Sequence, residues 1–228
     1  LDHSHGIEAI NNFDNQILLP EQLSYFGPKI VVADFNNNGS EEVLVAGTKT
    51  QKAEIYTFQN NNFSKKTSNF SFANNQNISI ADFNQDGFKD IYFANGTYEN
   101  SNLELQNDEV WLNDGKGNFW KKISINDGIN NKTATLFDLE NDGDLDVFLG
   151  GNVKPGKYPL EEESKILIND GQGNFKVLAI GKIGLINDAK YLKKSNQLIA
   201  VGEWMNPISI TFKNNKPDIK PVCNNKSG

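Results

Sequence analysis

The feature that most constrains this chain is an internal repeat. Four segments share one plan, in which a short apolar strand is followed by a polar loop and a second apolar strand; they cover residues 30–47, 78–95, 134–151 and 189–202. The second strands begin at Val43, Ile91, Val147 and Leu198. A period of about 50 residues predicts a repeat architecture, because each unit can bury its apolar side only against a neighbouring unit.

A second phrase follows each of these segments and predicts a hairpin. The four hairpin phrases cover residues 55–63, 110–119, 166–175 and 210–219. Asn-Asp-Gly and Asn-Asn between apolar runs favour tight turns, because these residues accept a positive φ. Each repeat therefore supplies about four short strands, which is the content of a β-propeller blade.

We therefore predict an all-β fold, a β-propeller of four blades. The blades are expected at about 29–74, 75–130, 131–183 and 184–222, with residues 1–28 as a cap or closing strand and 223–228 as a tail. A ring closed by these four blades and a larger ring that other chains complete both stay open. An unrelated β-sandwich would not explain why the paired phrases recur four times.

Charge and composition exclude several classes of function. The net charge is −7, and all 22 basic residues are Lys, so a nucleic-acid partner is not expected. No window approaches the length of apolar chain that spans a membrane. The single Cys223 excludes an internal disulfide framework. With two His, one Cys and no Arg, the usual catalytic triads lack parts, and we expect no enzymatic activity.

The loops of the first three repeats carry the pattern Asp-x-(Asn/Asp/Glu)-x-(Asn/Asp)-Gly-x-x-(Asp/Glu). Oxygen side chains at alternate positions can face one centre, and the Gly permits the turn that returns the last acid. A set of oxygen donors alone suits a hard cation, and we predict two to three Ca²⁺ ions. The predicted ligands, in which Ser40, Phe88 and Asp144 act through a backbone carbonyl, are Asp34, Asn36, Asn38, Ser40, Glu42; Asp82, Asn84, Asp86, Phe88, Asp90; and Asp138, Glu140, Asp142, Asp144, Asp146.

Two other interpretations of these loops are an EF-hand and a simple turn. An EF-hand requires Glu at loop position twelve and flanking helices, but Val45, Phe93 and Leu149 stand there between predicted strands. Simple Asx-Gly turns would explain one such loop, whereas three at the same place in a repeat favour calcium. The first loop is expected to bind most weakly, because it has the fewest charged residues. The fourth repeat has Lys193 and Lys194 in a short turn, and no metal is predicted there.

Two smaller groups of residues are candidate sites of other kinds. His3 and His5 could share a transition metal, but we favour a solvated terminal segment. Trp111, Trp120 and Trp204 could form a platform for sugar stacking. Because all three lie beside strand phrases, we favour core packing for them.

The motifs resemble a known family. The loop at 82–90 and the phrase Asn-Asp-Gly-Lys-Gly-Asn-Phe at 113–119 resemble the FG-GAP/VCBS repeat, the blade unit of integrin α-subunit propellers. More narrowly, segments 18–28, 153–159 and 202–208 look like those of bacterial relatives of cartilage acidic protein, the ASPIC/UnbV-containing group. This chain departs from that family in having four repeats, an Asn-rich first loop and no loop in the fourth repeat.

The resemblance implies an extracellular protein or one on the bacterial outer-membrane surface. Its calcium ions would brace the blades on one face, while partners bind elsewhere. The expected function is a binding or scaffold module for protein or glycan at the cell surface. The alternative is an accessory subunit or glycan-processing component of a surface assembly, in which other chains complete the propeller.

Overall fold

The computed structural model describes residues 11–14, 16–19, 27–66, 68–96, 107–213 and 216–222. Two 3₁₀ turns occur there, η1 (Asn12–Asp14) and η4 (Lys193–Ser195); the rest of the regular structure is β-strand. Within these ranges no helix has the length and apolarity needed to cross a bilayer. Most of the predicted segment 1–28, with His3 and His5, lies outside the described residues, as does the tail 223–228 with Cys223.

The strands form four antiparallel sheets of four strands each, and in every sheet neighbouring strands follow one another in sequence. Blade 1 contains β1 (Ile30–Ala33), β2 (Glu42–Val45), β3 (Glu54–Gln59) and β4 (Asn62–Lys66). Blade 2 contains β5 (Asn75–Ala81), β6 (Asp90–Asn95), β7 (Asp108–Asn113) and β8 (Phe119–Ile125). Blade 3 contains β9 (Asn131–Phe137), β10 (Asp146–Gly151), β11 (Ser164–Asn169) and β12 (Phe175–Gly181). Blade 4 contains β13 (Leu185–Leu192), β14 (Gln197–Glu203), β15 (Ile208–Lys213) and β16 (Lys216–Pro221). The predicted all-β class and the four four-stranded blades are confirmed.

Burial along the strands shows which sheets are covered on both faces. In blades 2 and 3, β6 and β10 are buried at every position, because a neighbouring sheet lies on each side. In blade 4, Leu198 and Ala200 of β14 are buried, while Ile199 and Val201, which alternate with them, are not. Blade 4 is therefore covered on one face only.

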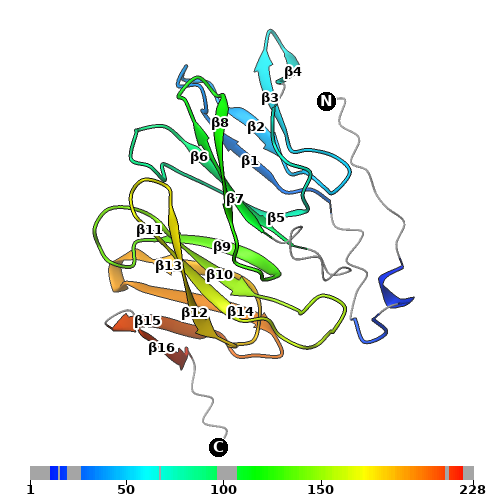
Figure 1. The fold of residues 1–228 in the computed structure, drawn as a ribbon, viewed down its shortest axis with the longest axis vertical. Helices are drawn as coiled ribbons and strands as arrows, with labels where there is room; N and C mark the ends of the chain where they lie inside the picture. Colours follow the sequence, from blue (N-terminus) through cyan, green and yellow to red (C-terminus); the bar gives the residue numbers. More distant parts are fainter. Residues whose placement is uncertain are drawn as a thin grey trace, which may run out of the picture.

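Three apolar cores join the blades in sequence. Leu44 and Ile55 of blade 1 pack with Ile91 and Phe93 of blade 2, and similar cores join blades 2 and 3 and blades 3 and 4. The first strands β1, β5, β9 and β13 contact one another in that order, whereas β1 and β13 form no comparable contact. Figure 1 shows blade 1 and blade 4 at opposite ends of the long axis, so the four blades form an open row.

The two ends of this row differ in chemistry. On the free face of blade 1, Val32 lies beside Val43, and Phe58 lies beside Phe63; Val32, Phe58 and Phe63 are exposed. On the free face of blade 4, four residues from the four neighbouring strands form a row with a lysine at each end. The row is Lys190, Ile199, Ser209 and Lys220. The free face of blade 1 is therefore largely apolar, with Lys65 beside Tyr56 as a charged member, whereas the free face of blade 4 is charged.

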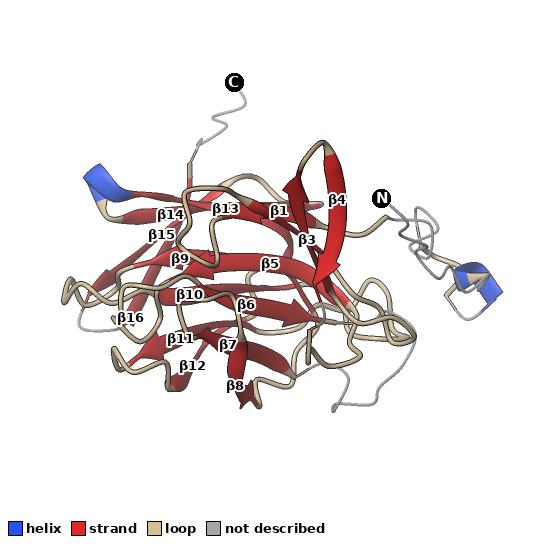
Figure 2. Ribbon diagram, turned by 90° about the horizontal axis from the view of Figure 1, so that it is seen from above, coloured by secondary structure: helices blue, strands red, loops and turns tan. Residues whose placement is uncertain are grey.

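The up-and-down order of the strands separates the loops into two groups. Loops between the first and second strands, and between the third and fourth, lie at one end of the sheets, which we call the loop end. The remaining connections lie at the other end, which we call the linker end. Figure 2 shows loops gathered at both ends of the strands, with η4 at the left.

Phe70 should be a main contributor to stability, because it joins the blade 1–blade 2 core from the linker between them. It is 1% exposed and its ring lies 5.2 Å from Phe93 and 5.3 Å from Trp111. We expect Phe70→Ala to lower the free energy of unfolding by about 3–5 kcal/mol in urea titrations. Phe72→Ala is the matched control, since Phe72 is 54% exposed. Equal losses for both variants would contradict this packing.

Candidate metal-binding loops

The three predicted loops join the first and second strands of blades 1, 2 and 3, and they share one geometry. In each, the first Asp accepts a hydrogen bond from the Gly five residues later: 2.9 Å from the Gly39 N–H to Asp34 Oδ2, 2.8 Å from Gly87 to Asp82 and 3.2 Å from Gly143 to Asp138. These glycines have φ between 85° and 94°, a conformation that other residues rarely adopt. The fixed Gly of the pattern is thus explained by backbone geometry.

The fifth position of each loop closes a second small turn. Asp86 Oδ1 accepts the N–H of Phe88 at 2.9 Å, and Asn38 and Asp142 do the same for the residue two further on. Such Asx turns orient the carbonyls and side chains of the loop. Asn84 Nδ2 also donates to Asp86 Oδ2 at 2.9 Å, so the third and fifth positions are in direct contact.

The ninth position holds a buried acid that fastens the loop to its blade. Asp90 accepts the N–H of Phe83 at 2.9 Å and that of Asn113 at 2.8 Å. Asp146 accepts equivalent bonds from Leu139 and Asn169, and Glu42 accepts the N–H of Phe35. The acid therefore joins the start of its loop to the end of the third strand in blades 2 and 3, a role that the sequence pattern did not predict.

The loop acids repel one another electrostatically. Burial, which outweighs the hydrogen bonds from backbone N–H groups, raises the pKa of Asp90 and of Asp146 to about 6. Burial and the nearby Asp142 carboxylate raise the pKa of Asp144 to about 7. A bound cation would relieve this repulsion and favour the ionised form of each acid.

The predicted ligand sets are composed of oxygen donors, which fits Ca²⁺. Among the described residues, no three Asp, Glu, His or Cys side chains gather closely enough to hold an ion by themselves. The Asn side chains and backbone carbonyls of the predicted sets would therefore be needed to complete each shell. In blade 4, the 3₁₀ turn η4 stands in place of such a loop.

At the loop end, the hairpins between the third and fourth strands of blades 2 and 3 contact the predicted metal-binding loop of the preceding blade. Asn113 Nδ2 donates to the Phe35 carbonyl at 2.7 Å, and Asn169 Nδ2 donates to the Phe83 carbonyl at 2.9 Å. Within the turn, Asp114 accepts hydrogen bonds from Asn118 that lower its pKa. The predicted loops of blades 1 and 2 are thus each linked to the next blade.

The tryptophans do not form one platform. Trp111 is 6% exposed and packs in the core as predicted, but Trp120 is 64% exposed and Trp204 is 85% exposed, so core packing was wrong for these two. Trp120 lies on the outer strand of blade 2, where no further strand covers it. Trp204 lies in the β14–β15 loop, at the linker end.

Trp204 belongs to a hydrogen-bonded group that sequence patterns did not identify. Its indole N–H donates to the Tyr158 hydroxyl at 3.2 Å, and that hydroxyl donates to Glu203 Oε2 at 3.0 Å. Trp204 also has a φ of 58°, an uncommon conformation for a bulky residue. The ring is therefore held in place while it stays open to solvent.

Comparison with known families decides the identity of the repeats. The model of the FG-GAP-like repeat matches residues 34–93 and again 82–149, so its two matches start at Asp34 and Asp82, the first residues of two metal loops. The chain belongs to the FG-GAP-like repeat family. The FG-GAP-like matches together contain all three predicted loops.

The comparisons with curated proteins and with solved structures support the fold and nothing further. No curated protein matches this FG-GAP-like chain. Among solved structures, it is similar to a lectin from Agrocybe aegerita that was solved for its specific recognition of non-reducing terminal N-acetylglucosamine, with 16% identity and a TM-score of 0.55. The similarity covers 87% of this chain and 53% of the lectin chain, so the FG-GAP-like chain spans about half of the lectin's length.

The raised pKa values predict a dependence of stability on pH. The folded-state pKa of Asp90 and Asp146 is about 6, against 3.8 as the ordinary value, so between these values the folded state holds more protons than the unfolded state. Stability of the chelated protein should therefore fall as the pH rises through this window.

Thermal melting in chelator between about pH 4.5 and 7.5 measures this effect. Millimolar Ca²⁺ should remove the decline, and Asp90→Asn should reduce it. A melting temperature that rises with pH in chelator would contradict the pKa shifts.

Proposed function

We propose that this chain is a calcium-stabilised binding module of the extracellular space or the bacterial outer-membrane surface. The observation that carries this proposal is the threefold loop geometry. Each loop is built from oxygen donors and holds a buried acid that is bonded only to neutral N–H groups. Membership of the narrower group of bacterial relatives of cartilage acidic protein is part of the same proposal.

The role of calcium in this proposal is structural. Each ion would neutralise repelling acids in its loop, and in blades 1 and 2, whose loops already contact the next blade, it would also brace the row. The first loop should bind most weakly, because only Asp34 and Glu42 of its predicted ligands are charged. Modules of this kind bind Ca²⁺ with Kd values of about 0.1–1 mM, which suits extracellular calcium. We expect no enzymatic activity.

Calcium titration of the chelated protein tests the loops. We expect Asp82→Ala to lose about one equivalent of Ca²⁺ in calorimetry, because Asp82 is the first ligand and also holds Gly87 in place. The calcium-induced rise in melting temperature should shrink with it.

Asp114→Ala is the control for this titration. Asp114 organises a turn at the same end of blade 2, where its carboxylate accepts the N–H of Lys116 at 2.8 Å, but it is outside the predicted ligand set. Its loss should leave the number of bound ions unchanged. Wild-type stoichiometry in Asp82→Ala would show that the loop is only a turn.

For the partner, we propose a glycan that stacks on Trp204. An indole ring presents a flat apolar face to sugar C–H groups, and Trp204 offers that face while Tyr158 fixes its N–H. Glu203 and the Tyr158 hydroxyl lie beside the ring and can bond sugar hydroxyls. The similarity to a glycan-binding lectin supports this choice of ligand class.

A protein partner is the alternative, supported by the exposed apolar side chains on the free face of blade 1. Such a partner, for example another chain of a surface assembly, would cover this end of the row and remove its apolar area from water.

Binding to a glycan array separates the two partners. We expect Trp204→Ala to reduce binding at least about tenfold, since a stacking contact and its hydrogen bonds are lost. Trp120→Ala, which removes an exposed tryptophan elsewhere, should leave binding unchanged. Absence of glycan binding, together with self-association or complex formation that Val32→Lys abolishes, would favour the protein partner instead.

A further inference from the structure

A group of buried polar side chains, which we call the pocket, lies at the linker end between blades 2 and 3, away from the predicted metal-binding loops. It is formed by Asn107 and Asp108 at the start of β7, and by Asp127, Asn130 and Asn131 at the β8–β9 linker and the start of β9. Asp108 is fully buried and Asp127 is 2% exposed. The Asp108 N–H lies 3.4 Å from Asp127 Oδ1, and Asn131 Nδ2 lies 3.4 Å from Asp108 Oδ2, so these three residues are in contact.

Four oxygens of this pocket are buried without any hydrogen-bond donor. They are Asn107 Oδ1, Asp127 Oδ2, Asn130 Oδ1 and Asn131 Oδ1. The Asn130 amide nitrogen donates to the Val153 carbonyl at 2.9 Å, whereas the Asn130 amide oxygen accepts no hydrogen bond from a described residue. Burial of an unpartnered polar atom is costly, and so many in one place require an explanation.

The equivalent place between blades 1 and 2 shows which hydrogen bonds the pocket lacks. There Asn74 and Asn75 precede and begin β5, as Asn130 and Asn131 do for β9. The oxygen of Asn74 accepts the Lys49 N–H at 2.9 Å, and the oxygen of Asn75 accepts the Gly47 N–H at 2.7 Å. Between blades 2 and 3, no described residue donates a hydrogen bond to the corresponding oxygens of Asn130 and Asn131.

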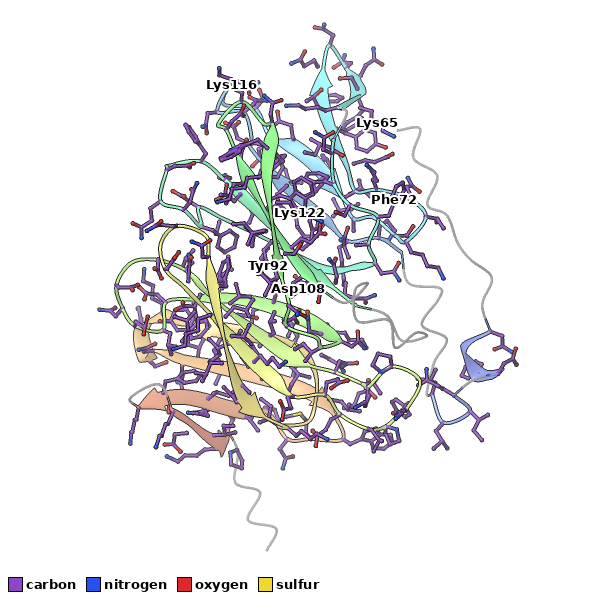
Figure 3. The ribbon with its side chains drawn as sticks, viewed as in Figure 1. Lys65, Phe72, Tyr92, Asp108, Lys116 and Lys122 are labelled. Atoms are coloured by element: carbon purple, nitrogen blue, oxygen red, sulfur yellow. The ribbon has the colours of Figure 1, made fainter. Side chains whose placement is uncertain are left out.

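The charge of the pocket is also unbalanced. Burial, and then repulsion by Asp127, raise the pKa of Asp108 well above its ordinary value. Asp108 is held by the Tyr92 hydroxyl, which donates to it, and by the Asn95 N–H at 2.7 Å; Figure 3 shows Tyr92 and Asp108 side by side. The nearest ammonium, on Lys165, donates to the backbone carbonyl of Asp127 rather than to a carboxylate. Neutral donors thus hold Asp108, while burial raises the pKa of Asp127 to about 7 even though the charge of Lys165 lowers it.

We propose that this pocket binds one Ca²⁺ ion, held by the carboxylates of Asp108 and Asp127 and by the amide oxygens of Asn107, Asn130 and Asn131. The five side chains offer carboxylate and amide oxygens, and a hard divalent cation takes such ligands in numbers that match this set. An enclosed water molecule would satisfy some of the acceptors but would not stabilise the ionised form of the two acids, as a cation would. The ion would fasten the β8–β9 linker to β7 and so fix blade 3 against blade 2.

The test compares calcium stoichiometry in Asp127→Asn and wild-type protein by equilibrium dialysis. We expect the variant to lose one equivalent that the loop variant Asp82→Ala keeps. Asp127→Asn retains the acceptor for the Asp108 N–H, so the fold should survive. Glu163→Gln is the control, because it removes the same charge from an exposed position.

Terbium luminescence gives a second readout. Tyr92 contacts Asp108, so Tb³⁺ in the pocket should show tyrosine-sensitised emission that Tyr92→Phe reduces by at least half. Crystals of the wild-type protein grown with Tb³⁺ should show an anomalous peak between Asp108 and Asp127. This measurement decides the question even where a variant fails to fold.

Different results would overturn the proposal for the pocket and the proposal for the loops. Full stoichiometry in Asp127→Asn, no peak at Asp108, and a higher melting temperature of the variant in both chelator and calcium would overturn the pocket. Those results would indicate a protonated acid pair or enclosed water, while loss of an ion in Asp82→Ala would still support the loops. An ion at Asp108 with none at Asp82 would support the pocket and overturn the loops.

Discussion

Packing of one sheet against the next is the constraint on which the whole structure depends. A four-stranded sheet with two apolar faces cannot remove both from water alone, and the chain solves this by stacking four sheets with three cores between them. Blades 2 and 3 are covered on both faces, so β6 and β10 are buried throughout. The free faces at the two ends then differ: blade 4 is charged, as a terminal sheet in water should be, while blade 1 keeps exposed apolar side chains.

The polar ends of the sheets secure the contacts between blades. At the loop end, the buried acids Asp90 and Asp146 bond backbone N–H groups of the third strand, and Asn113 and Asn169 reach the preceding blade. Packing therefore brings carboxylates into places where neutral donors hold them but nothing cancels their charge. In the proposed function, stability and calcium affinity would be coupled through these acids, because an ion that neutralises a loop would also strengthen the contact between two blades.

Two sets of polar residues lie at the linker end, one buried and one exposed. Asp108 and Asp127 lie inside, between blades 2 and 3, whereas Trp204 stands on the surface with Tyr158 and Glu203. The first group would fix blades, and the second would contact a ligand. If both proposals hold, ions brace the row at both ends of the sheets and leave an aromatic surface for recognition at one of them.

The sequence by itself determined the elements that depend on local patterns. Apolar alternation, Asn-Asp-Gly turns and the spacing of Asp34, Asp82 and Asp138 were sufficient to predict four-stranded blades and the position of three loops, because turn chemistry and strand periodicity act over a few residues. Only the tertiary structure decided the rest. Asp108 and Asp127 meet because β7 and the β8–β9 linker are brought together at the boundary of two blades, and Trp204 is exposed because no sheet covers its loop. Burial and charge at such places depend on neighbours distant in sequence, which no local pattern contains.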